Sequence, residues 1–335
     1  MTYHERQEIK NERSRLLDVV PLSQPYVIFL EPSGSCNFSC VFCPCNNSKW
    51  NTNNRHQIMD IALFAKIVSD LEAFPEPIKV VELYAFGEPL LNPHIADMVS
   101  ILKETGKVDT VRITTNGSLL TPSLSKSLID AGLDYLKISV EALTEEDYKR
   151  VCGYTISLPE FIENIAFFYR ASRGTGTHLG VKALSNTLSG GSKERFLEIY
   201  SPISDYTFIE TAYDQWAEFD KMKYPGDSVI HDSFTDKTSD HDICSFPLTH
   251  MLICANGDIG LCCLDWKHGT AYANVKEVSL PEAWNSDRLR EIRVKHLKHK
   301  RNELPYCSSC TQKGYDNVDE DAEAIYEKLA GSRAE

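Results

Sequence analysis

Four cysteines lie within one ten-residue segment of the chain, in the stretch SGSCNFSCVFCPCNN. Cys36, Cys40 and Cys43 have C-x3-C-x2-C spacing. Three thiolates on one short loop can bind three irons of a cubane 4Fe-4S cluster and leave the fourth iron open to a small molecule. A structural zinc ion is the alternative, because a fourth ligand such as Cys45 would close a tetrahedral site. The spacing alone leaves both kinds of metal centre open.

A second group of cysteines lies closer to the C-terminus. Its members are Cys244, Cys254, Cys262, Cys263, Cys307 and Cys310. The last two form a chelating C-x2-C pair, and two thiolates from the preceding group would complete a four-thiolate set for an iron-sulphur cluster or for structural zinc. Four ligands close a site, so we expect no small molecule to bind this metal. We interpret Cys254 and the isolated Cys152 as ordinary buried thiols.

The composition indicates a globular protein of the cytoplasm. The first twenty residues are charged throughout and lack the apolar core of a signal peptide, and no later run is long enough for a membrane span. Eleven cysteines in a cytoplasmic chain stay reduced, which favours metal binding over disulfides. The formal charge of -13 repels phosphate backbones and anionic lipids. We therefore expect neither nucleic acid nor a membrane as a partner.

Short apolar runs alternate with helical patterns over the first two thirds of the chain. The runs resemble strands buried on both faces, and they span 26–32, 80–87, 110–117, 135–142, 178–184 and 207–212. The helical patterns have apolar residues at three- and four-residue spacing, and they span 59–74, 93–106, 122–132 and 158–172. This alternation predicts a parallel α/β fold, open or barrel-like, with ligands at the carboxyl ends of the strands.

The position of Cys36, Cys40 and Cys43 directly after the first predicted strand resembles the radical S-adenosylmethionine (SAM) enzymes. In that family the three cysteines hold a 4Fe-4S cluster whose open iron chelates SAM. An electron from the cluster splits SAM into methionine and a 5'-deoxyadenosyl radical, which abstracts hydrogen from the substrate. The resemblance implies a partial (β/α)6 TIM-like barrel, and an external one-electron donor of the flavodoxin or ferredoxin type.

Two segments resemble the family's motifs for the amino group and ribose of SAM. YAFGEPLLNP is similar to the glycine-glycine-glutamate-proline motif, with Phe86 at the first glycine, and implies that Gly87 and Glu88 contact the amino group. RITTNGSLL implies ribose contacts for Thr115 and Asn116. The alternatives are a glycine turn with a solvated glutamate, and an Asn-Gly turn without a ligand.

The resemblance implies further SAM contacts on other strands. Ser139 and Glu141 in KISVEAL correspond to ribose-contacting positions, Lys182 to a basic residue for the SAM carboxylate, and Phe42 to an aromatic residue beside adenine. A solvated lysine and a plain core aromatic remain alternatives for the last two positions.

The C-terminal cysteines resemble the auxiliary-cluster domains of the SPASM and Twitch group. The one-cluster arrangement implies Cys244, Cys262, Cys307 and Cys310 as ligands of one auxiliary 4Fe-4S cluster, with Cys262 favoured over Cys263. The cysteines are too few for two auxiliary clusters. We expect five segments: an N-terminal extension (1–24), the barrel (25–215), a connection (216–243), the cysteine-rich domain (244–315) and a solvated helix or tail (316–335).

The resemblance implies oxidation of a small hydroxylated molecule, such as a sugar, aminosugar or cyclitol, to a ketone, with electron transfer to the auxiliary cluster. Modification of a ribosomal peptide is an alternative, although we expect the short N-terminus to leave no room for a peptide-recognition domain. Epimerisation is another, with Cys254 or Cys263 as hydrogen donor, and a zinc-binding interaction protein is the non-enzymatic alternative. Acidic and aromatic residues of the connection (Glu210, Tyr213, Asp214 and Trp216), with His250 and Asp265, are candidates for substrate or proton contacts. The sequence identifies no catalytic base and no oligomeric state.

Overall fold

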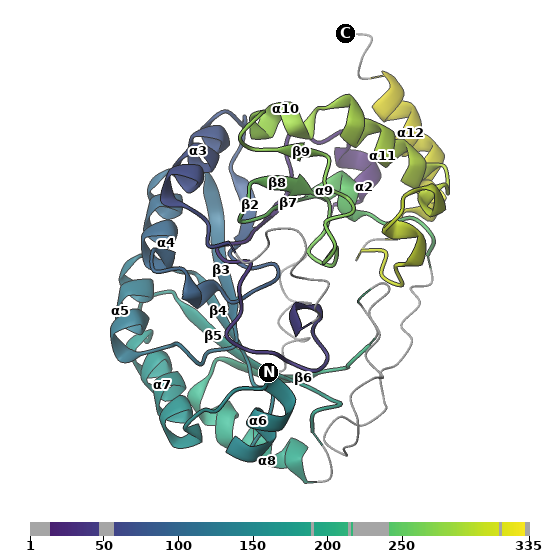
Figure 1. Cartoon of the computed structure of the whole chain (residues 1–335). Helices are drawn as coiled ribbons and strands as arrows, with labels where there is room; N and C mark the ends of the chain where they lie inside the picture. Colours follow the sequence, from purple (N-terminus) through teal and green to yellow (C-terminus); the bar gives the residue numbers. More distant parts are fainter. Residues whose placement is uncertain are drawn as a thin grey trace.

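The chain is described by a computed structural model over residues 14–46, 57–188, 191–213, 216, 241–314 and 317–331. The connection predicted at 216–243 and the N-terminal extension therefore lie largely outside the described residues. Within these ranges one nine-stranded sheet runs in the order β6-β5-β4-β3-β2-β1-β7-β8-β9. Helices cover the outer side of its curved parallel part (Figure 1).

Six parallel strands alternate with helices, which confirms the predicted α/β class. The strands are β1 (Val27–Leu30), β2 (Ile78–Glu82), β3 (Val108–Thr115), β4 (Tyr135–Ser139), β5 (His178–Leu184) and β6 (Tyr206–Glu210). The helices are α3 (Ile61–Glu72), α4 (Ile95–Glu104), α5 (Pro122–Asp130), α6 (Glu145–Cys152), α7 (Leu158–Ala171) and α8 (Ser192–Tyr200). Short 3-10 turns lie at η1 (Pro44–Asn46), η3 (Pro89–Leu91) and η4 (Ser201–Ile203).

Local sequence signals fix where several helices begin. The Asp60 side chain accepts a hydrogen bond from Ala62 N at the start of α3. Thr121 caps α5 in the same way and is followed by Pro122, which lacks the N–H that a first helical turn leaves unpaired. Thr144 caps α6. The caps of α3 and α5 place the starts of these helices close to those predicted from the sequence, whereas α6 was not predicted.

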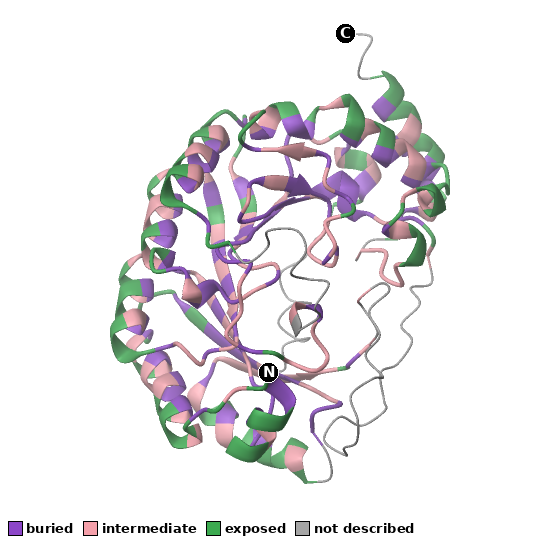
Figure 2. Ribbon diagram, viewed as in Figure 1, coloured by how far each residue is buried: buried purple, intermediate pink, exposed green. Residues whose placement is uncertain are grey.

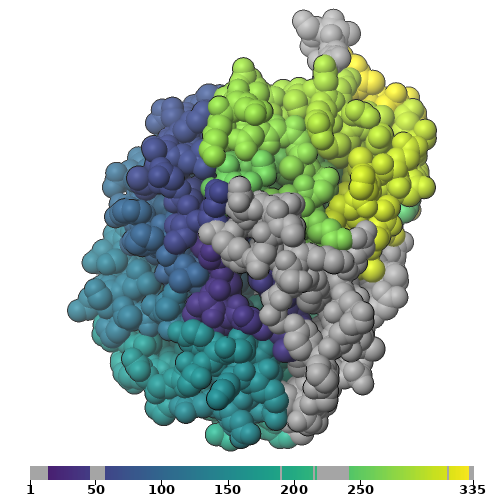
Figure 3. All heavy atoms as spheres, in the orientation of Figure 1, coloured from purple at the N-terminus to yellow at the C-terminus, as the bar shows by residue number. Residues whose placement is uncertain are grey.

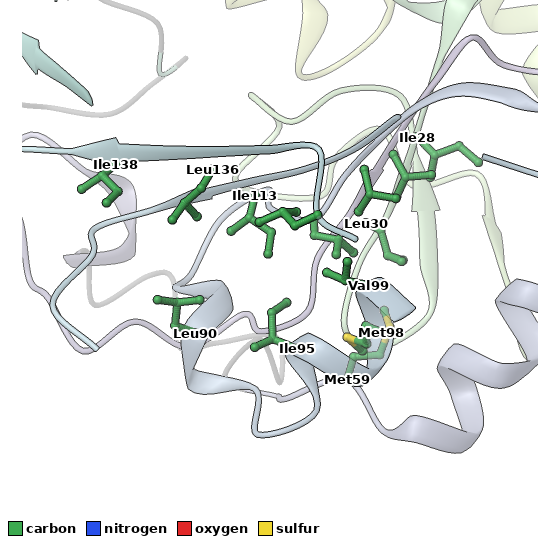
Figure 4. Close-up of a cluster of buried hydrophobic side chains, with 14 of the residues drawn as sticks. Ile28, Leu30, Met59, Leu90, Ile95, Met98, Val99, Ile113, Leu136 and Ile138 are labelled. Carbon is green, nitrogen blue, oxygen red and sulfur yellow. The ribbon is translucent and has the colours of Figure 1, made fainter. Parts of the chain in front are cut away.

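The main core lies between the sheet and its outer helices. Side chains from β3 and β4, such as Ile113, Leu136 and Ile138, meet side chains of α4, including Ile95 and Met98 (Figure 4). Strand β4 alternates buried and half-buried residues, so the expectation of strands buried on both faces is wrong for it. The half-buried face lines the inside of the barrel, whereas Figure 2 shows exposure concentrated on the outer faces of the helices.

The C-terminal cysteine-rich region continues the barrel sheet. Strand β7 (His250–Ile253) pairs in parallel with β1, with Val27 opposite His250, and β8 (Asp258–Gly260) and β9 (Ala273–Asn274) follow antiparallel. Around these strands lie α9 (Phe246–Thr249), α10 (Leu280–Trp284), α11 (Asp287–Leu297), η6 (Arg301–Glu303) and η7 (Cys307–Ser309). Because β7 runs parallel to β1, with Ile253 opposite Leu30, β7 ends at the sheet edge from which the first cysteine loop leaves.

The two ends of the described chain pack together. Helix α2 (Leu16–Val19), the turn η8 (Asp319–Asp321) and α12 (Ala322–Gly331) lie against α11, and Leu16, Ile325 and Leu329 belong to a second apolar cluster. Arg15 forms an ion pair with Asp321. One face of α12 is therefore buried, contrary to the expectation of a solvated terminal helix.

Candidate functional site

Cys36, Cys40 and Cys43 lie on the loop that leaves the carboxyl end of β1. This loop is attached to the end of α6, because Ser39 N donates a hydrogen bond to Cys152 O at 2.7 Å. Cys43 N donates to Cys40 O at 3.0 Å, which closes a tight turn. In Figure 3 the purple part of the chain, to which the loop belongs, reaches this face of the molecule between the blue and teal parts of the barrel.

The thiols of this loop are a donor set that suits an iron cluster. Burial, followed by the nearby Glu88 carboxylate, raises the pKa of Cys36 to about 12. Contact with the Cys152 thiol, followed by burial, raises the pKa of Cys40 well above its usual value. Buried thiolates of this kind need neighbouring positive charge, which bound iron supplies, so these residues fit the cluster that the sequence predicts.

Two further thiols lie beside the loop. Cys45 donates a hydrogen bond to Cys43 and thereby lowers the pKa of Cys43, and Cys152 contacts Cys40. No spacing rule connects Cys152 to a loop more than a hundred positions earlier, so its contact with Cys40 could not be predicted from the sequence. Among the described residues, no three His, Cys, Asp or Glu side chains are placed to hold a single metal ion.

The segment after β2 has a backbone shape that requires glycine. Gly87 has a φ of +27°, and a Cβ there would lie 2.0 Å from Ser33 O. The neighbouring Glu88 is 2% exposed and accepts hydrogen bonds from Leu90 N (3.0 Å) and Asn116 N (2.8 Å). Burial raises the pKa of Glu88, and these donors oppose that rise. Glu88 thus joins the exits of β2 and β3, and its contact with SAM stays a prediction.

Asn116 connects the end of β3 to the cysteine loop. Its Nδ2 donates to Asn37 Oδ1 at 2.9 Å and lies 4.0 Å from Cys36 Sγ. Its Oδ1 accepts from the backbone and hydroxyl of Ser118. The predicted ribose residue therefore lies beside the predicted cluster, although its amide is already occupied by protein groups. Thr115, the other candidate of this segment, donates from its hydroxyl to Glu88 at 2.5 Å.

The end of β4 carries a carboxylate with spare hydrogen-bonding capacity. Glu141 is 9% exposed, its Oε2 has no hydrogen-bond partner among the described residues, and burial raises its pKa to about 7. A buried oxygen without a donor costs free energy unless a ligand supplies one. The hydroxyl groups of a ribose are suitable donors, so Glu141 fits its predicted role. Ser139, the other predicted ribose residue of β4, is half-buried at the strand end.

The interior of the barrel carries charges on five successive strands. Glu82 of β2 pairs with Arg112 of β3 at 3.4 Å, and Lys182 of β5 pairs with Glu210 of β6 at 2.5 Å. Lys137 of β4 lies between these pairs, and burial followed by Lys182 lowers its pKa. Lys182 is thus not a solvated lysine. The sequence does not reveal this row of interior charges, because the residues become neighbours only once the register of the strands is known.

Lys137 carries a positive charge that neither of the two ion pairs neutralises. Its Nζ lies 5.7 Å from the centre of the Tyr84 ring, and it has no ion-pair partner within the described ranges. An interior with this charge suits a small polar ligand better than an apolar one. Phe42, predicted to lie beside adenine, is half-buried and packs against the main core.

Four of the C-terminal thiols line one cavity. The thiols are those of Cys244, Cys262, Cys307 and Cys310. Burial is the main cause that raises the pKa of Cys310 to about 11, and it also raises that of Cys244. Cys263 is not part of this lining, which favours Cys262 as the ligand. His296 also lines the cavity, and both its ring nitrogens are buried without a hydrogen-bond partner in the described structure.

The other candidates for proton or substrate contacts either have structural roles or lie outside the described residues. Asp265 is fully buried and accepts hydrogen bonds from Gly269 N and Thr270 N. His250 is stacked on Phe29, and its Nδ1 lies 2.7 Å from Thr249 Oγ1. Trp216 lies near Phe86, at 6.5 Å between ring centres, and Tyr213 is half-buried. Asp214 lies outside the described residues.

Two family profiles match the chain. The Radical SAM superfamily profile matches residues 30–187, and the profile of SPASM, described as an iron-sulphur cluster-binding domain, matches residues 244–311. These spans contain the first cysteine loop and the four thiols of the C-terminal cavity. None of the helices in the described ranges combines the length and apolar character needed to cross a bilayer.

Similarity to individual proteins is partial in sequence and broader in fold. The tungsten-containing aldehyde ferredoxin oxidoreductase cofactor-modifying protein of Pyrococcus furiosus is 35% identical over 45% of this chain, and the match spans only 40% of that relative. BtrN in complex with AdoMet and 2-DOIA is 17% identical with a TM-score of 0.54, over 86% of this chain and 93% of BtrN. Streptococcus suis SuiB bound to precursor peptide SuiA is 17% identical with a TM-score of 0.56, over 81% and 66%. The structural likenesses show a shared fold.

Proposed function

The chain belongs to the radical SAM superfamily and carries a SPASM domain, and on that premise we propose that it oxidises an alcohol of a small hydroxylated molecule to a ketone. When bound, SAM and its 4Fe-4S cluster supply the radical that abstracts hydrogen, and an auxiliary cluster supplies an acceptor for the remaining electron. Cys36, Cys40 and Cys43 would hold the first cluster. The substrate class is a sugar, an aminosugar or a cyclitol.

The closed second site is the observation that carries this proposal. Four thiols line the C-terminal cavity, and four ligands leave no position on a cluster for SAM or substrate. A closed cluster beside a radical site can still accept an electron. An oxidation requires such an acceptor, whereas a redox-neutral rearrangement does not.

The charged row inside the barrel supports a small and polar substrate. Glu82, Lys137 and Glu210 present both donors and acceptors on the face that lines the barrel. Groups of this kind can orient a hydroxylated ring through charged hydrogen bonds, which are stronger in a partly dry interior than in water. The likeness to BtrN, solved with AdoMet and 2-DOIA, agrees with a small ligand.

Peptide modification is a second candidate, favoured by one observation. The SuiB structure of similar fold contains a precursor peptide. A peptide extending through the barrel would have to pass the row of paired charges. We therefore rank oxidation of a small molecule first.

Product analysis under anaerobic conditions tests the proposal. The reduced, cluster-loaded protein is incubated with SAM and a panel of sugars, aminosugars and cyclitols, and ketones are trapped with a hydrazine reagent. We expect about one ketone for each 5'-deoxyadenosine formed. The Cys36→Ala/Cys40→Ala/Cys43→Ala variant is the control and should form neither product. Deuterium incorporation from heavy water at a substrate carbon, without ketone, would instead indicate epimerisation and contradict the proposal.

A further inference from the structure

Cys254 lies at the carboxyl end of β7, a strand that the barrel sheet shares with the C-terminal region. Because β7 runs parallel to β1, Cys254 lies at the same sheet edge as Glu31, and Ala255 N donates to Glu31 Oε2 at 2.9 Å. Catalytic side chains of parallel α/β folds gather at this edge. The topology therefore adds Cys254 to the edge that carries the candidate cluster and SAM residues.

Cys254 is one end of a chain of three polar groups. Its Sγ lies 3.4 Å from His268 Nε2, and His268 Nδ1 lies 3.8 Å from Asp258 Oδ2. Asn256 and Asn274 donate side-chain hydrogen bonds to the Asp258 carboxylate, at 2.7 and 3.0 Å. A carboxylate facing Nδ1 favours the imidazole form with hydrogen on Nδ1, which leaves Nε2 free to accept the thiol proton.

The surroundings hold His268 in an unusual backbone conformation. Its φ is +52°, in the left-handed region that non-glycine residues rarely adopt, and its side chain is 8% exposed. The ring lies 5.7 Å from the ring of Phe86 in the glycine-glutamate segment. A histidine kept in a costly conformation at a functional edge suggests a function for its ring.

The Cys254 thiol belongs to an apolar cluster that cysteines of both groups contact. Cys254 and Phe86 belong to one apolar cluster, and Cys45 from the first group and Cys263 from the second both pack against it. An ordinary core thiol would contact apolar atoms, whereas Cys254 contacts an imidazole that a carboxylate supports. This arrangement has the order of groups found in activated nucleophiles and proton relays.

We propose that Cys254, His268 and Asp258 form an acid–base triad in which His268 accepts the thiol proton and keeps Cys254 as a reactive thiolate. Its role in the reaction rests on the proposed function. In that oxidation the carbinol C–H bond would break, with its hydrogen atom going to the 5'-deoxyadenosyl radical, and the O–H bond would break, with its proton forming an S–H bond on Cys254. An auxiliary cluster held by the C-terminal cysteines would accept the one remaining electron as the C=O bond forms.

Thiol labelling tests the triad without substrate or SAM. The anaerobically purified, cluster-loaded protein is treated with iodoacetamide at about pH 6.5, where an ordinary thiol is largely protonated. Mass spectrometry then follows alkylation of Cys254, which is 1% exposed, with the equally buried Cys152 (0% exposed) of the same digest as the internal comparison. We expect Cys254 to react about tenfold faster than Cys152, and about tenfold faster than Cys254 of the variants without the relay.

The variants are chosen to keep the fold. His268→Asn retains a residue type that tolerates positive φ, and Asp258→Asn removes only the charge. His94→Gln removes an exposed histidine that lies 3.1 Å from Asp97, and is expected to leave the labelling rate of Cys254 unchanged. Iron content is measured for each protein. If the His268→Asn variant loses its iron, the labelling rate of Cys254 in the Asp258→Asn variant decides the test.

Two results would overturn the triad. One is a wild-type Cys254 that labels no faster than in Asp258→Asn, and the other is a Cys254 that labels only after unfolding. Because labelling needs neither substrate nor SAM cleavage, a reactive Cys254 in a protein that forms no ketone would refute the proposed oxidation and retain the triad. Ketone formation with an unreactive Cys254 would do the reverse.

Discussion

At the carboxyl ends of the strands, the backbone restricts which residue types individual positions can hold. Gly87 accommodates the close approach of the segment before Cys36, since a Cβ would lie 2.0 Å from Ser33 O. Glu88, the next residue, then reaches the backbone of Asn116. A small residue and a carboxylate at these positions are therefore structural needs as well as predicted SAM contacts.

Replacing Gly87 by alanine is expected to lower the free energy of unfolding by about 3 kcal/mol, because the substitution combines a positive φ with a backbone clash. Gly106→Ala is the matched control. Gly106 also has a positive φ, of +63°, but a Cβ there meets nothing within 4 Å, so we expect a loss of only about 1 kcal/mol. Urea unfolding measures both, and equal losses would contradict the account.

The half-buried His250 predicts how the free energy of unfolding changes with pH. Burial lowers its pKa from 6.5 to about 3 in the folded chain, so below about pH 6.5 the unfolded chain binds the proton more tightly. The contribution of His250 to the free energy of unfolding should be constant above that pH and should fall by about 1.4 kcal/mol per pH unit below it, towards about pH 3.

Urea unfolding between about pH 7 and about pH 5 would detect this slope. The His250→Gln substitution should remove the part of this slope that comes from one proton. The His94→Gln substitution, at an exposed histidine, should leave the slope unchanged. An unchanged slope in His250→Gln would show that this histidine is not held neutral.

Among the elements, β7 determines how the two cysteine groups are related. It belongs to the C-terminal region in sequence and to the barrel sheet in structure, where it pairs with β1 over four residues. The pairing places Cys254 beside Glu31 and fixes the position of the C-terminal cysteines relative to the first cysteine loop. A shared sheet gives the two sites a fixed separation, which a flexible linker would not provide.

Hydrogen exchange can test this continuity. We expect amides of β7 to exchange within about tenfold of the rate for β2, because both strands pair with β1 in the same sheet. Helix α12 at the C-terminal end serves as the comparison and should exchange faster. Exchange of β7 at the rate of α12 would mean that the C-terminal region opens independently of the barrel.

For the whole molecule, the sequence alone was sufficient to predict the fold class and to predict that the first cysteine loop follows a strand. Alternating strand and helix patterns predicted the parallel sheet, and the spacing of Cys36, Cys40 and Cys43 predicted a metal-binding loop, which the structure places at the end of β1. Short-range signals suffice here, because helix caps and three- or four-residue spacing are local properties.

The remaining features depend on contacts between distant residues. The pairing of β7 with β1 joins segments more than two hundred positions apart, and the interior charges meet only once the strands are in register. Cys254 was interpreted as an ordinary core thiol, because its partners, Asp258 at the start of β8 and His268 in a later turn, have no recognisable spacing. Such sites arise from tertiary packing and have no local signature.

The proposed function requires that two separate cysteine sets hold two iron clusters, one open and one closed. The direct measurement is iron and acid-labile sulphide per chain after anaerobic purification, for the wild type and for two variants. One lacks Cys36, Cys40 and Cys43, and the other lacks Cys244, Cys262, Cys307 and Cys310. We predict about eight irons in the wild type and about four in each variant. About four irons in the wild type and none in the first variant would contradict the second cluster, and with it the proposed electron acceptor.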